Sequence, residues 1–321
     1  MNRFSEEKRL NINGVEKMLQ AIIDIGSNSI RLAIYKIENE KVELLMNKKE
    51  IARLAAYVVN GFMNSEGIEK ACYVLKDFKN LLDNLQINNV IAFATAAIRN
   101  AHNSNDIVKA IKHKTGLKVI VLSGAEEARL GFIGAIKDIK NTAGVMADIG
   151  GGSTEIVTYH NSQIKHAISL PLGALNVTKA HVKGILPTVQ ECNEIKKAVL
   201  AELKKNEELL TERYDIFGGI GGTLRGTCKI NNYLFKATEK NRIITTKNIK
   251  KIIDILVADN TENFVSKNTL HLLLSTVPER VETIFPGMVI LVTLLEYFAT
   301  ETVILSDSGV REGYIDKYIL N

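Results

Sequence analysis

The chain has 321 residues, of which 46% are hydrophobic and 24% are charged. These are the proportions of an ordinary globular protein, so they exclude a disordered, collagenous or fibrous chain, and the length predicts about two domains. The formal net charge of +5 suits an anionic partner. It is too small to indicate nucleic acid, because nucleic-acid-binding proteins concentrate positive charge far more strongly.

Targeting and membrane signals are not evident in the sequence. Segment 1–9 carries charges of both signs without an apolar core, which argues against a secretory signal. The most apolar stretch, 283–295, contains a proline and a glycine and is shorter than the roughly 20 residues that a spanning helix needs. Three scattered cysteines predict neither a disulfide framework nor a metal cluster: Cys72, Cys192 and Cys228. We therefore expect a cytoplasmic protein with no membrane and no nucleic-acid partner.

A strand followed by a polar turn occurs twice at a constant offset of 124 residues, the separation of Asp24 from Asp148. Asp24-Ile-Gly-Ser-Asn-Ser29 recurs as Asp148-Ile-Gly-Gly-Gly-Ser153, and Tyr35 falls on Tyr159 at the same offset. Both turns are followed by β-branched and aromatic residues, at 30–37 and 154–159, as is typical of strands. The simplest interpretation is two similar domains, each of which opens with the same hairpin.

Helix and strand patterns alternate through the rest of the chain, which favours mixed or parallel sheets covered by helices. In chain order we expect a helix at 68–85, a buried strand at 90–97, a helix at 106–115, a strand at 118–122, a helix at 125–136, a helix from 188 to about 210 and a strand at 215–217.

The two turns have the chemistry of phosphate sites, because small residues expose backbone N–H groups beside a carboxylate. Taken alone, the first turn is better explained as an ordinary hairpin, since Gly, Asn and Ser dominate turns. The second turn is harder to explain in this way, because its three consecutive glycines cost conformational entropy on folding. We therefore expect residues 150–153 to bind phosphate and Asp148 to hold a divalent cation beside it.

A third glycine cluster, 218–222, follows an apolar strand pattern. Its spacing is not G-x-G-x-x-G, and the chain has no P-loop, so a dinucleotide site is weakly supported. Close packing of a helix on the sheet explains these glycines equally well.

Two acidic residues and one arginine are the remaining candidates. Glu126 and Glu127 open a helix, where acids often stabilise the helix dipole, but a glutamate near phosphate could also take a proton from water. Arg99 follows a buried strand, a suitable place for a bidentate phosphate contact. Arg31 and Arg53 are further candidates, although strand arginines usually extend to the surface.

Several of these segments, taken in order, resemble the Ppx/GppA phosphatases, the exopolyphosphatases and guanosine pentaphosphate phosphohydrolases. The similarity extends over nearly the whole chain from about residue 20. The segments that carry it are Asp24-Ile-Gly-Ser-Asn-Ser-Ile-Arg31, Arg53-Leu54, Ala94-Thr-Ala-Ala-Ile-Arg99-Asn100, Ser123-Gly-Ala-Glu-Glu-Ala-Arg129, Asp148-Ile-Gly-Gly-Gly-Ser-Thr-Glu155, Leu172-Gly173-Ala174, Gly221-Gly222-Thr223 and Pro278-Glu-Arg280.

The resemblance implies the actin/Hsp70/sugar-kinase fold, with two duplicated, ribonuclease H-like α/β domains on either side of a cleft. We place these domains at 21–137 and 138–321, after a flexible or helical extension at 1–20. Longer family members carry a further C-terminal helical domain of the HD type, for which 321 residues leave no room. We therefore expect a preference for shorter polyphosphate chains.

The resemblance also implies removal of a terminal phosphoryl group by water, with Mg²⁺ or another divalent cation as cofactor. The leading hypothesis is an exopolyphosphatase that releases orthophosphate from inorganic polyphosphate. Guanosine pentaphosphate (pppGpp) is the alternative substrate, and an ATP-binding kinase or conformational protein of the same fold, or a non-enzymatic sensor, is a more distant alternative. A homodimer is expected from the resemblance only.

Site residues follow from the same resemblance. Glu127 aligns with the catalytic glutamate of the family, and Glu126 stays the alternative because one sequence cannot settle a shift of one residue. Asp24 and Asp148 are expected to hold the metal, and Gly221, Gly222 and Thr223 form a possible substrate loop. The expected phosphate-binding residues are Gly26, Ser27, Asn28, Ser29, Arg99, Gly150, Gly151, Gly152 and Ser153.

Overall fold

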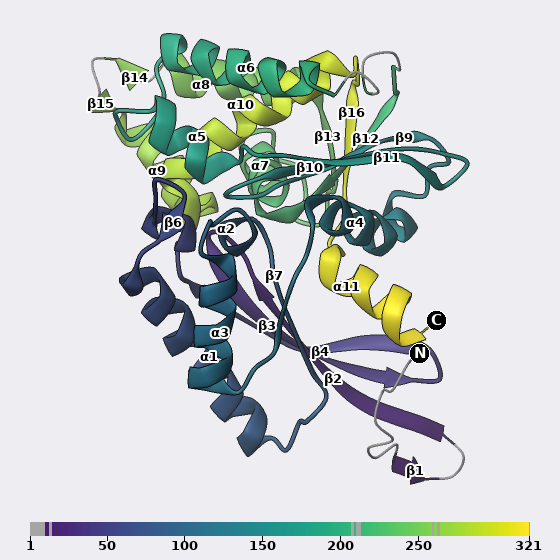
Figure 1. Cartoon of the computed structure of the whole chain (residues 1–321). Coiled ribbons are helices and arrows are strands. Elements are labelled where there is room, and N and C mark those ends of the chain that lie inside the picture. The colour runs from purple at the N-terminus through teal and green to yellow at the C-terminus, as the bar shows by residue number, and fades with distance from the viewer. Residues whose placement is uncertain are drawn as a thin grey trace. The chain divides into compact units, whose positions relative to one another are not determined.

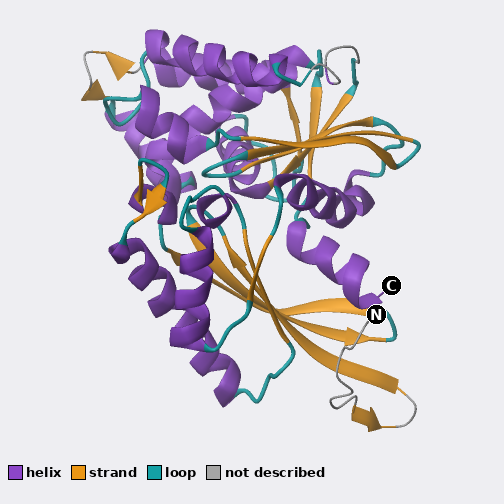
Figure 2. Cartoon of the chain, in the orientation of Figure 1, coloured by secondary structure: helices purple, strands orange, loops and turns teal. Residues whose placement is uncertain are grey.

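The structure of the protein, a computed structural model, describes residues 10–12, 15–206, 209, 213–258, 260–261 and 264–320. Apart from the last two residues, its internal contacts divide the chain into two compact units, Met1–Leu122 and Ser123–Ile319. Each unit is an α/β structure with its own sheet and its own helices (Figures 1 and 2).

Unit 1 contains a sheet with the strand order β4-β3-β2-β7-β8. The strands β2, β3 and β4 form an antiparallel meander, and β7 and β8 continue the sheet in parallel with β2. Their bounds are β2 (Val15–Ile25), β3 (Ser29–Glu38), β4 (Lys41–Ile51), β7 (Val90–Ala94) and β8 (Val119–Val121).

The expected extension at 1–20 is partly strand. A short strand, β1 (Leu10–Ile12), pairs with the first residues of β2, and β2 already begins at Val15. These segments are therefore extended rather than helical, because backbone pairing with β2 and β3 supplies their hydrogen bonds. The rest of the extension lies outside the described residues.

Two helices, α1 (Ser65–Asn84) and α3 (Ser104–Thr115), pack against each other and against the sheet of unit 1 (Figure 1). The apolar face of α1 is buried, including Leu75, Phe78 and Leu82, as the helical spacing of the sequence predicts. Gly116 ends α3 with a positive φ of 74°, which glycine adopts without steric cost. The shorter elements are η1 (Leu54–Tyr57), β5 (Val58–Val59), β6 (Phe62–Met63) and α2 (Ala96–Arg99).

Unit 2 repeats this topology. Its sheet has the order β11-β10-β9-β12-β16-β13, in which β9, β10 and β11 form the meander and β12 and β16 are parallel to β9. Both copies carry an irregularity at the same place, between Ile34 and Tyr35 and between Thr158 and Tyr159. The strands are β9 (Gly144–Ile149), β10 (Thr154–His160), β11 (Gln163–Leu170), β12 (Ile216–Ile220), β13 (Ile243–Thr245) and β16 (Thr302–Leu305).

Helices cover both faces of the second sheet. α4 (Gly124–Ile139) packs on β9, β10, β11 and β12 and also contacts α11 (Val310–Ile315). α7 (Gly221–Leu234) and α10 (Val281–Tyr297) pack beneath the opposite face around the larger core cluster. The remaining elements are α5 (Ala174–His181), α6 (Val189–Lys204), α8 (Thr246–Ala258), β14 (Asn260–Thr261), β15 (Phe264–Val265), α9 (Lys267–Thr276), η3 (Pro278–Arg280) and the final turn η4 (Asp316–Leu320).

The most apolar segment of the chain is the core helix α10. Residues 283–291 are buried around its whole circumference, which is the signature of a helix enclosed by protein. Among the described residues, no helix combines the length and the apolar character required to cross a bilayer.

The structure differs from the expected elements at several ends. The strand expected at 90–97 ends at Ala94, where α2 begins two residues later, and the helix expected to reach about residue 210 ends at Lys204. The contacts also divide the chain between Leu122 and Ser123, earlier than the boundary we expected at 137/138, because α4 packs on the second sheet.

Candidate functional site

The first polar turn joins β2 to β3 in unit 1. It is closed by a hydrogen bond of 3.1 Å from the Gly26 N–H to the carbonyl of Ser29. The carbonyl of Ser27 accepts from the N–H of Ala55, and that of Asn28 accepts from the two residues before η1. In the part of the chain that the structure describes, the N–H groups of Ser27 and Asn28 have no hydrogen-bond acceptor. The turn therefore presents two amide donors while its carbonyls are held by the following segment.

The second turn joins β9 to β10 in unit 2 with the same geometry. The Gly150 N–H donates to the carbonyl of Ser153 at 3.0 Å. The carbonyls of Gly150 and Gly151 accept from the first residues of α5, and no described residue accepts from the N–H groups of Gly151 and Gly152. Each of the two turns thus carries two N–H groups that have no acceptor among the described residues, which suits a phosphate oxygen.

Arg99 lies beside the first turn, within unit 1. The Thr95 N–H donates to the carbonyl of Ile25 at 3.2 Å, and the Arg99 N–H donates to the carbonyl of Thr95 at 2.9 Å, so α2 begins where β2 ends. The guanidinium of Arg99 is half-buried and donates to the carbonyl of Leu122 at 3.3 Å. This contact restricts the orientation of the arginine.

Each unit carries an aspartate two residues before the first glycine of its turn. Asp24 pairs in register with Arg31 of β3, and Asp148 pairs with Glu155 of β10. Side chains of directly paired residues lie on the same face of an antiparallel sheet. The repeated position beside the aspartate therefore holds a cation in unit 1 and a second carboxylate in unit 2.

Three acidic side chains line one small cavity of unit 2: Glu127, Asp148 and Glu155. Glu127 is 9% exposed and Glu155 is 3% exposed, and Glu155 accepts a hydrogen bond of 2.7 Å from the Ser169 hydroxyl. Apolar side chains, including Ile220 and Val310, complete the wall. A carboxylate in such a site is protected from bulk solvent, which is a suitable setting for proton transfer.

Glu126 and Glu127 occupy different environments although they are neighbours in α4. Glu126 accepts hydrogen bonds from the Lys317 ammonium, at 2.8 Å, and from the Tyr318 hydroxyl. Burial acts to raise the pKa of Glu126, but these hydrogen bonds and the attraction of Lys317 and Arg129 outweigh burial and hold the pKa below its ordinary value. Glu126 thus ties α4 to the C-terminal turn η4, while Glu127 lines the acidic cavity.

The third glycine cluster divides into two parts. Gly218 and Gly219 belong to β12, where a Cβ would meet Ile139 and Leu224 at 2.5 and 3.0 Å. Close packing therefore explains these two glycines. Gly221 and Gly222 form the first turn of α7 rather than a loop, and the Thr223 hydroxyl donates to the carbonyl of Ile149 at 2.8 Å.

Gly221 and Gly222 each allow a functional side chain to approach the backbone. Gly221 has a φ of +82°, and a Cβ there would lie 1.9 Å from a carboxylate oxygen of Asp148. A Cβ on Gly222 would lie 1.9 Å from the guanidinium of Arg280, in η3. The start of α7 thus lies between the cavity aspartate and an arginine.

The donor set of unit 2 fits Mg²⁺, which prefers oxygen ligands and usually binds through one or two carboxylates, water and substrate phosphates. Asp148 and its neighbours in the acidic cavity supply carboxylate oxygens. Across the described residues, no three acidic, histidine or cysteine side chains are assembled to hold a metal by themselves.

Two residues of this region were not among the expected site residues: Glu155 and Arg280. The sequence contained a signal for both. Glu155 stands at the repeat position of Arg31, and Arg280 belongs to a segment that carries the family resemblance. Neither signal predicts a role in the site, because only the fold brings Glu155 next to Asp148 and Arg280 next to Gly222.

Comparison with known proteins identifies relatives over nearly the whole chain. Residues 33–321 match the model of the Ppx/GppA phosphatase family. The chain is 30% identical over 314 residues to a bifunctional 3-dehydroquinate synthase/phosphatase of Fusobacterium nucleatum, with 92% of this chain and 46% of that protein covered. It is 25% identical over 310 residues to a guanosine-5'-triphosphate,3'-diphosphate pyrophosphatase of Vibrio cholerae, with 94% and 59% covered. The chain thus spans about half the length of these curated relatives.

A solved structure shares the fold. The crystal structure of an exopolyphosphatase from Cytophaga hutchinsonii superposes with a TM-score of 0.81 at 23% identity, covering 93% of this chain and 97% of that one. Together with the two repeated sheets, this likeness confirms the expected duplicated α/β fold class of the actin/Hsp70/sugar-kinase type.

Proposed function

Because the chain belongs to the Ppx/GppA phosphatase family, we propose that it hydrolyses the terminal phosphoanhydride bond of inorganic polyphosphate and releases orthophosphate. The observation that supports this proposal most directly is the acidic cavity of unit 2, where Glu127, Asp148 and Glu155 come together. The turn that follows Asp148 presents its amide donors without an acceptor of its own. Phosphoryl transfer to water requires a general base, a ligand for the cation and hydrogen-bond donors for the phosphate oxygens.

Glu127 is assigned as the general base. It accepts a proton from the attacking water as the new P–O bond forms and the bond to the bridging oxygen breaks, so that the shortened chain leaves as a phosphate anion. Glu126 already accepts hydrogen bonds from Lys317 and Tyr318, which favours Glu127 as the general base. The N–H groups of the turn that follows Asp148 are assigned to the terminal phosphate. The phosphate-binding roles of the first turn and of Arg99 stay predictions from the family resemblance.

Mg²⁺ or another divalent cation is the proposed cofactor. Asp148 would hold it, and the bound ion would neutralise phosphate charge. A metal-binding role of Asp24 stays a prediction from the family resemblance. Gly221 contributes indirectly, because its lack of a side chain leaves space for the Asp148 carboxylate. A homodimer and a cytoplasmic location rest on the resemblance and the cysteine content and stay predictions.

A change of Glu127 to Gln tests the assignment of the base. We expect the turnover number to fall by about 10²–10⁴-fold, because the proton acceptor is lost while size and shape are kept. Polyphosphate binding, measured by titration calorimetry, should persist. The adjacent change Glu126→Gln is the informative comparison. If it removes turnover and Glu127→Gln does not, the base is Glu126 and our assignment is wrong.

Guanosine pentaphosphate is the second candidate substrate, favoured by the similarity to the Vibrio cholerae enzyme. Orthophosphate release from polyphosphate and from pppGpp, measured in parallel with Mg²⁺, distinguishes the two. A much higher kcat/KM for pppGpp would replace polyphosphate as the substrate. Release from neither would contradict both candidates.

A further inference from the structure

One face of α7 carries a row of positive charge. Gly222, Arg225 and Lys229 follow at spacings of three and four residues, so they lie on the same side of the helix. The guanidinium of Arg280 lies against the backbone of Gly222 on this face. Arg280, Arg225 and Lys229 therefore succeed one another along α7, and the row begins at the glycine next to Gly221, where Asp148 packs.

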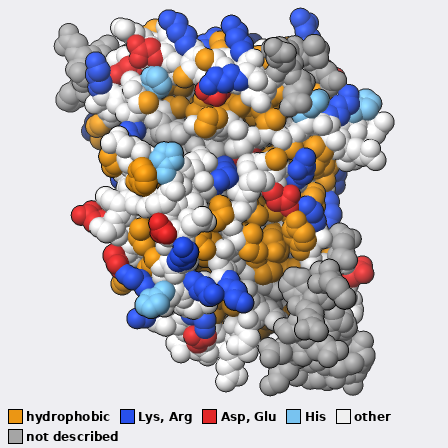
Figure 3. Space-filling model, in the orientation of Figure 1, with side chains coloured by type: hydrophobic (Ala, Val, Ile, Leu, Met, Phe, Trp, Pro, Cys, Tyr) orange, Lys and Arg blue, Asp and Glu red, His pale blue; other side chains and the backbone are white. Residues whose placement is uncertain are grey.

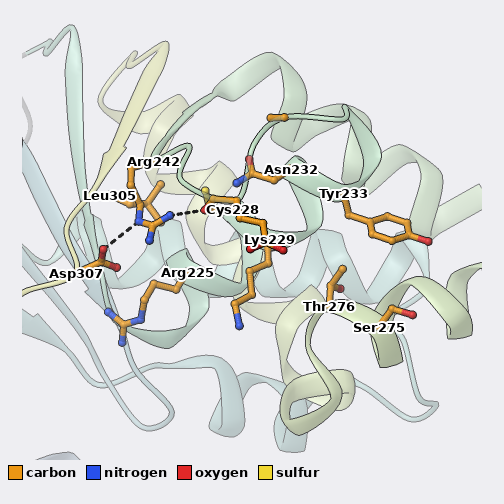
Figure 4. A pocket seen from close by; sticks show the side chains of 12 residues that line it. Arg225, Cys228, Lys229, Asn232, Tyr233, Arg242, Ser275, Thr276, Leu305 and Asp307 are labelled. Carbon is orange, nitrogen blue, oxygen red and sulfur yellow. Dashed lines mark hydrogen bonds and ion pairs between the residues drawn. The ribbon is translucent and has the colours of Figure 1, made fainter. Parts of the chain in front are cut away.

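The row leads into a cavity of unit 2. It has a volume of about 510 Å³ and is lined by Arg225 and Lys229, by Arg242 and Asp307, and by polar residues at the end of α9 such as Thr276. Figure 4 shows Arg225 and Lys229 extending from α7, and Arg242 directed at Asp307. None of these residues lines the acidic cavity around Glu127.

One wall of this cavity is held in place by hydrogen bonds. Arg242 contacts the Asp307 carboxylate at 3.1 Å and donates to the carbonyls of Glu239 and Asn241 at 2.8 and 3.2 Å. The Asn232 amide donates to the carbonyls of Thr238 and Asn241 at 3.1 and 3.2 Å, which fastens the loop after α7 back onto the helix. The cavity is therefore formed before any ligand binds.

Lys229 is the cation best placed to serve a ligand. Its side chain is exposed, and within the described segments it makes no ion pair or hydrogen bond. Asp307 is paired with Arg242, and Glu239 is the second carboxylate of the lining. Basic residues outnumber acidic residues among those that line the cavity, which suits an anion.

We propose that this cavity is a distal phosphate subsite, in which Arg225 and Lys229 bind polyphosphate units several positions away from the bond that is cleaved. The inference rests on the proposed polyphosphatase function. At 1.5 Å per residue, Gly222 and Lys229 differ by about 10 Å along the axis of α7. A long polyphosphate chain whose end lies beside Asp148 can extend along α7 as far as Lys229, and each of its phosphate units is negatively charged. A short chain does not extend as far as Lys229.

Steady-state kinetics with tripolyphosphate and with long-chain polyphosphate test the subsite in the whole chain. For the double change Arg225→Gln and Lys229→Gln we expect the KM for long chains to rise by about tenfold more than the KM for tripolyphosphate, as two ion contacts of about 0.7 kcal/mol each would give. The kcat for long chains should change little. Lys229→Gln alone, at an exposed position, should give part of the effect without disturbing the fold.

The control is Lys251→Gln, an exposed lysine of α8 that does not line the cavity. Equal KM changes for both chain lengths, or a long-chain KM unaffected by the double change, would overturn the proposal. Tighter binding of a nucleoside triphosphate than of tripolyphosphate, lost in the double variant, would make the cavity a nucleoside site and would also overturn it.

Direct binding separates this inference from the proposed function. If the unaltered protein does not hydrolyse polyphosphate, the proposed function fails, but fluorescence anisotropy with labelled long-chain polyphosphate still compares it with the double variant. Weaker binding in the variant supports the subsite whatever the turnover. Equal binding contradicts the subsite even if polyphosphate is hydrolysed.

Discussion

Two neighbouring glutamates show how strongly position within one helical turn decides the role of a residue. Residues one position apart on a helix are rotated by about 100°, so Glu126 and Glu127 cannot face the same surroundings. Glu126 is tied to the C-terminal turn, and Glu127 lines the acidic cavity. The sequence presents both as first-turn acids of α4, and the fold assigns them different partners.

The pairing of Glu126 with Lys317 predicts a pH-dependent contribution to stability. Because the folded-state pKa of Glu126 lies below its ordinary value of 4.5, the contribution is present above that value and is lost as the pH falls through the folded pKa. Lys317→Met should therefore lower the Tm at pH 7, by a stability change of about 0.5–1 kcal/mol for a partly exposed pair.

Thermal unfolding between pH 3 and pH 7 measures this dependence. The difference between Lys317→Met and the unaltered protein should shrink towards zero at the acid end, where Glu126 is protonated. Glu126→Gln should behave in the same way. A Tm difference that stays constant across this range would show that Lys317 acts through packing instead.

At the scale of the element, the repeated hairpin turn is the feature that the fold uses twice. In each unit the carbonyls of the turn accept hydrogen bonds from the segment that follows the meander, and two N–H groups stay available. The supporting segment differs, since η1 supplies it in unit 1 and α5 in unit 2. The two units thus share the geometry of the turn, whereas the segment that holds the turn in place differs between them.

Asn176 of α5 supports the second turn, and its loss should disturb that turn. Its amide donates to the carbonyl of Gly152 at 3.0 Å, and its side-chain oxygen accepts from the N–H of Gly173. We expect Asn176→Ala to lower the free energy of unfolding by about 1–2 kcal/mol, because both partners lose a hydrogen bond, and to lower kcat/KM because the amides of the turn lose their fixed direction.

Thr178→Ala is the matched control for this prediction, since the hydroxyl of Thr178 donates to the carbonyl of Ala174 within α5 and does not touch the turn. Chemical denaturation and orthophosphate release are measured on both variants. If Asn176→Ala loses stability but keeps the activity of the Thr178→Ala control, the turn does not depend on this support.

At the scale of the whole molecule, the small positive charge balance corresponds to no single-sign surface on the face viewed in Figure 3, where basic and acidic side chains are interspersed. Basic side chains lie at particular places instead, at Arg99 in unit 1 and along α7 in unit 2. The interpretation of +5 as a sign of a small anionic partner agrees with this distribution.

Salt should therefore weaken substrate binding in a graded manner. We expect the KM for polyphosphate to rise as the ionic strength increases from 0.05 to about 0.5 M, because screening shortens the reach of exposed charges to a few ångströms. The rise should be steeper for long chains, which make more ionic contacts, than for tripolyphosphate. Initial rates of orthophosphate release measure it. A KM independent of salt for both substrates would mean that binding is dominated by contacts other than exposed ion pairs.

The duplication, the fold class and the family were all predicted from the amino-acid sequence. A repeat of strand and turn at one offset is a linear pattern, and the residues that form a turn are local in the chain, so residues 24–29 and 148–153 were identifiable without coordinates. Helical spacing likewise predicted the buried face of α1, because amphipathic periodicity is a local property. Element ends were less accurate, since capping and packing decide them.

Only the tertiary structure decided which distant residues come together. Glu155 reaches the cavity of Asp148 through strand pairing, Arg280 reaches Gly222 from a segment nearly sixty residues later, and α4 joins the second sheet rather than the first. The close approaches at Gly221 and Gly222 also depend on how α7 packs. These contacts depend on the three-dimensional path of the backbone, so the spacing of residues along the chain does not predict them.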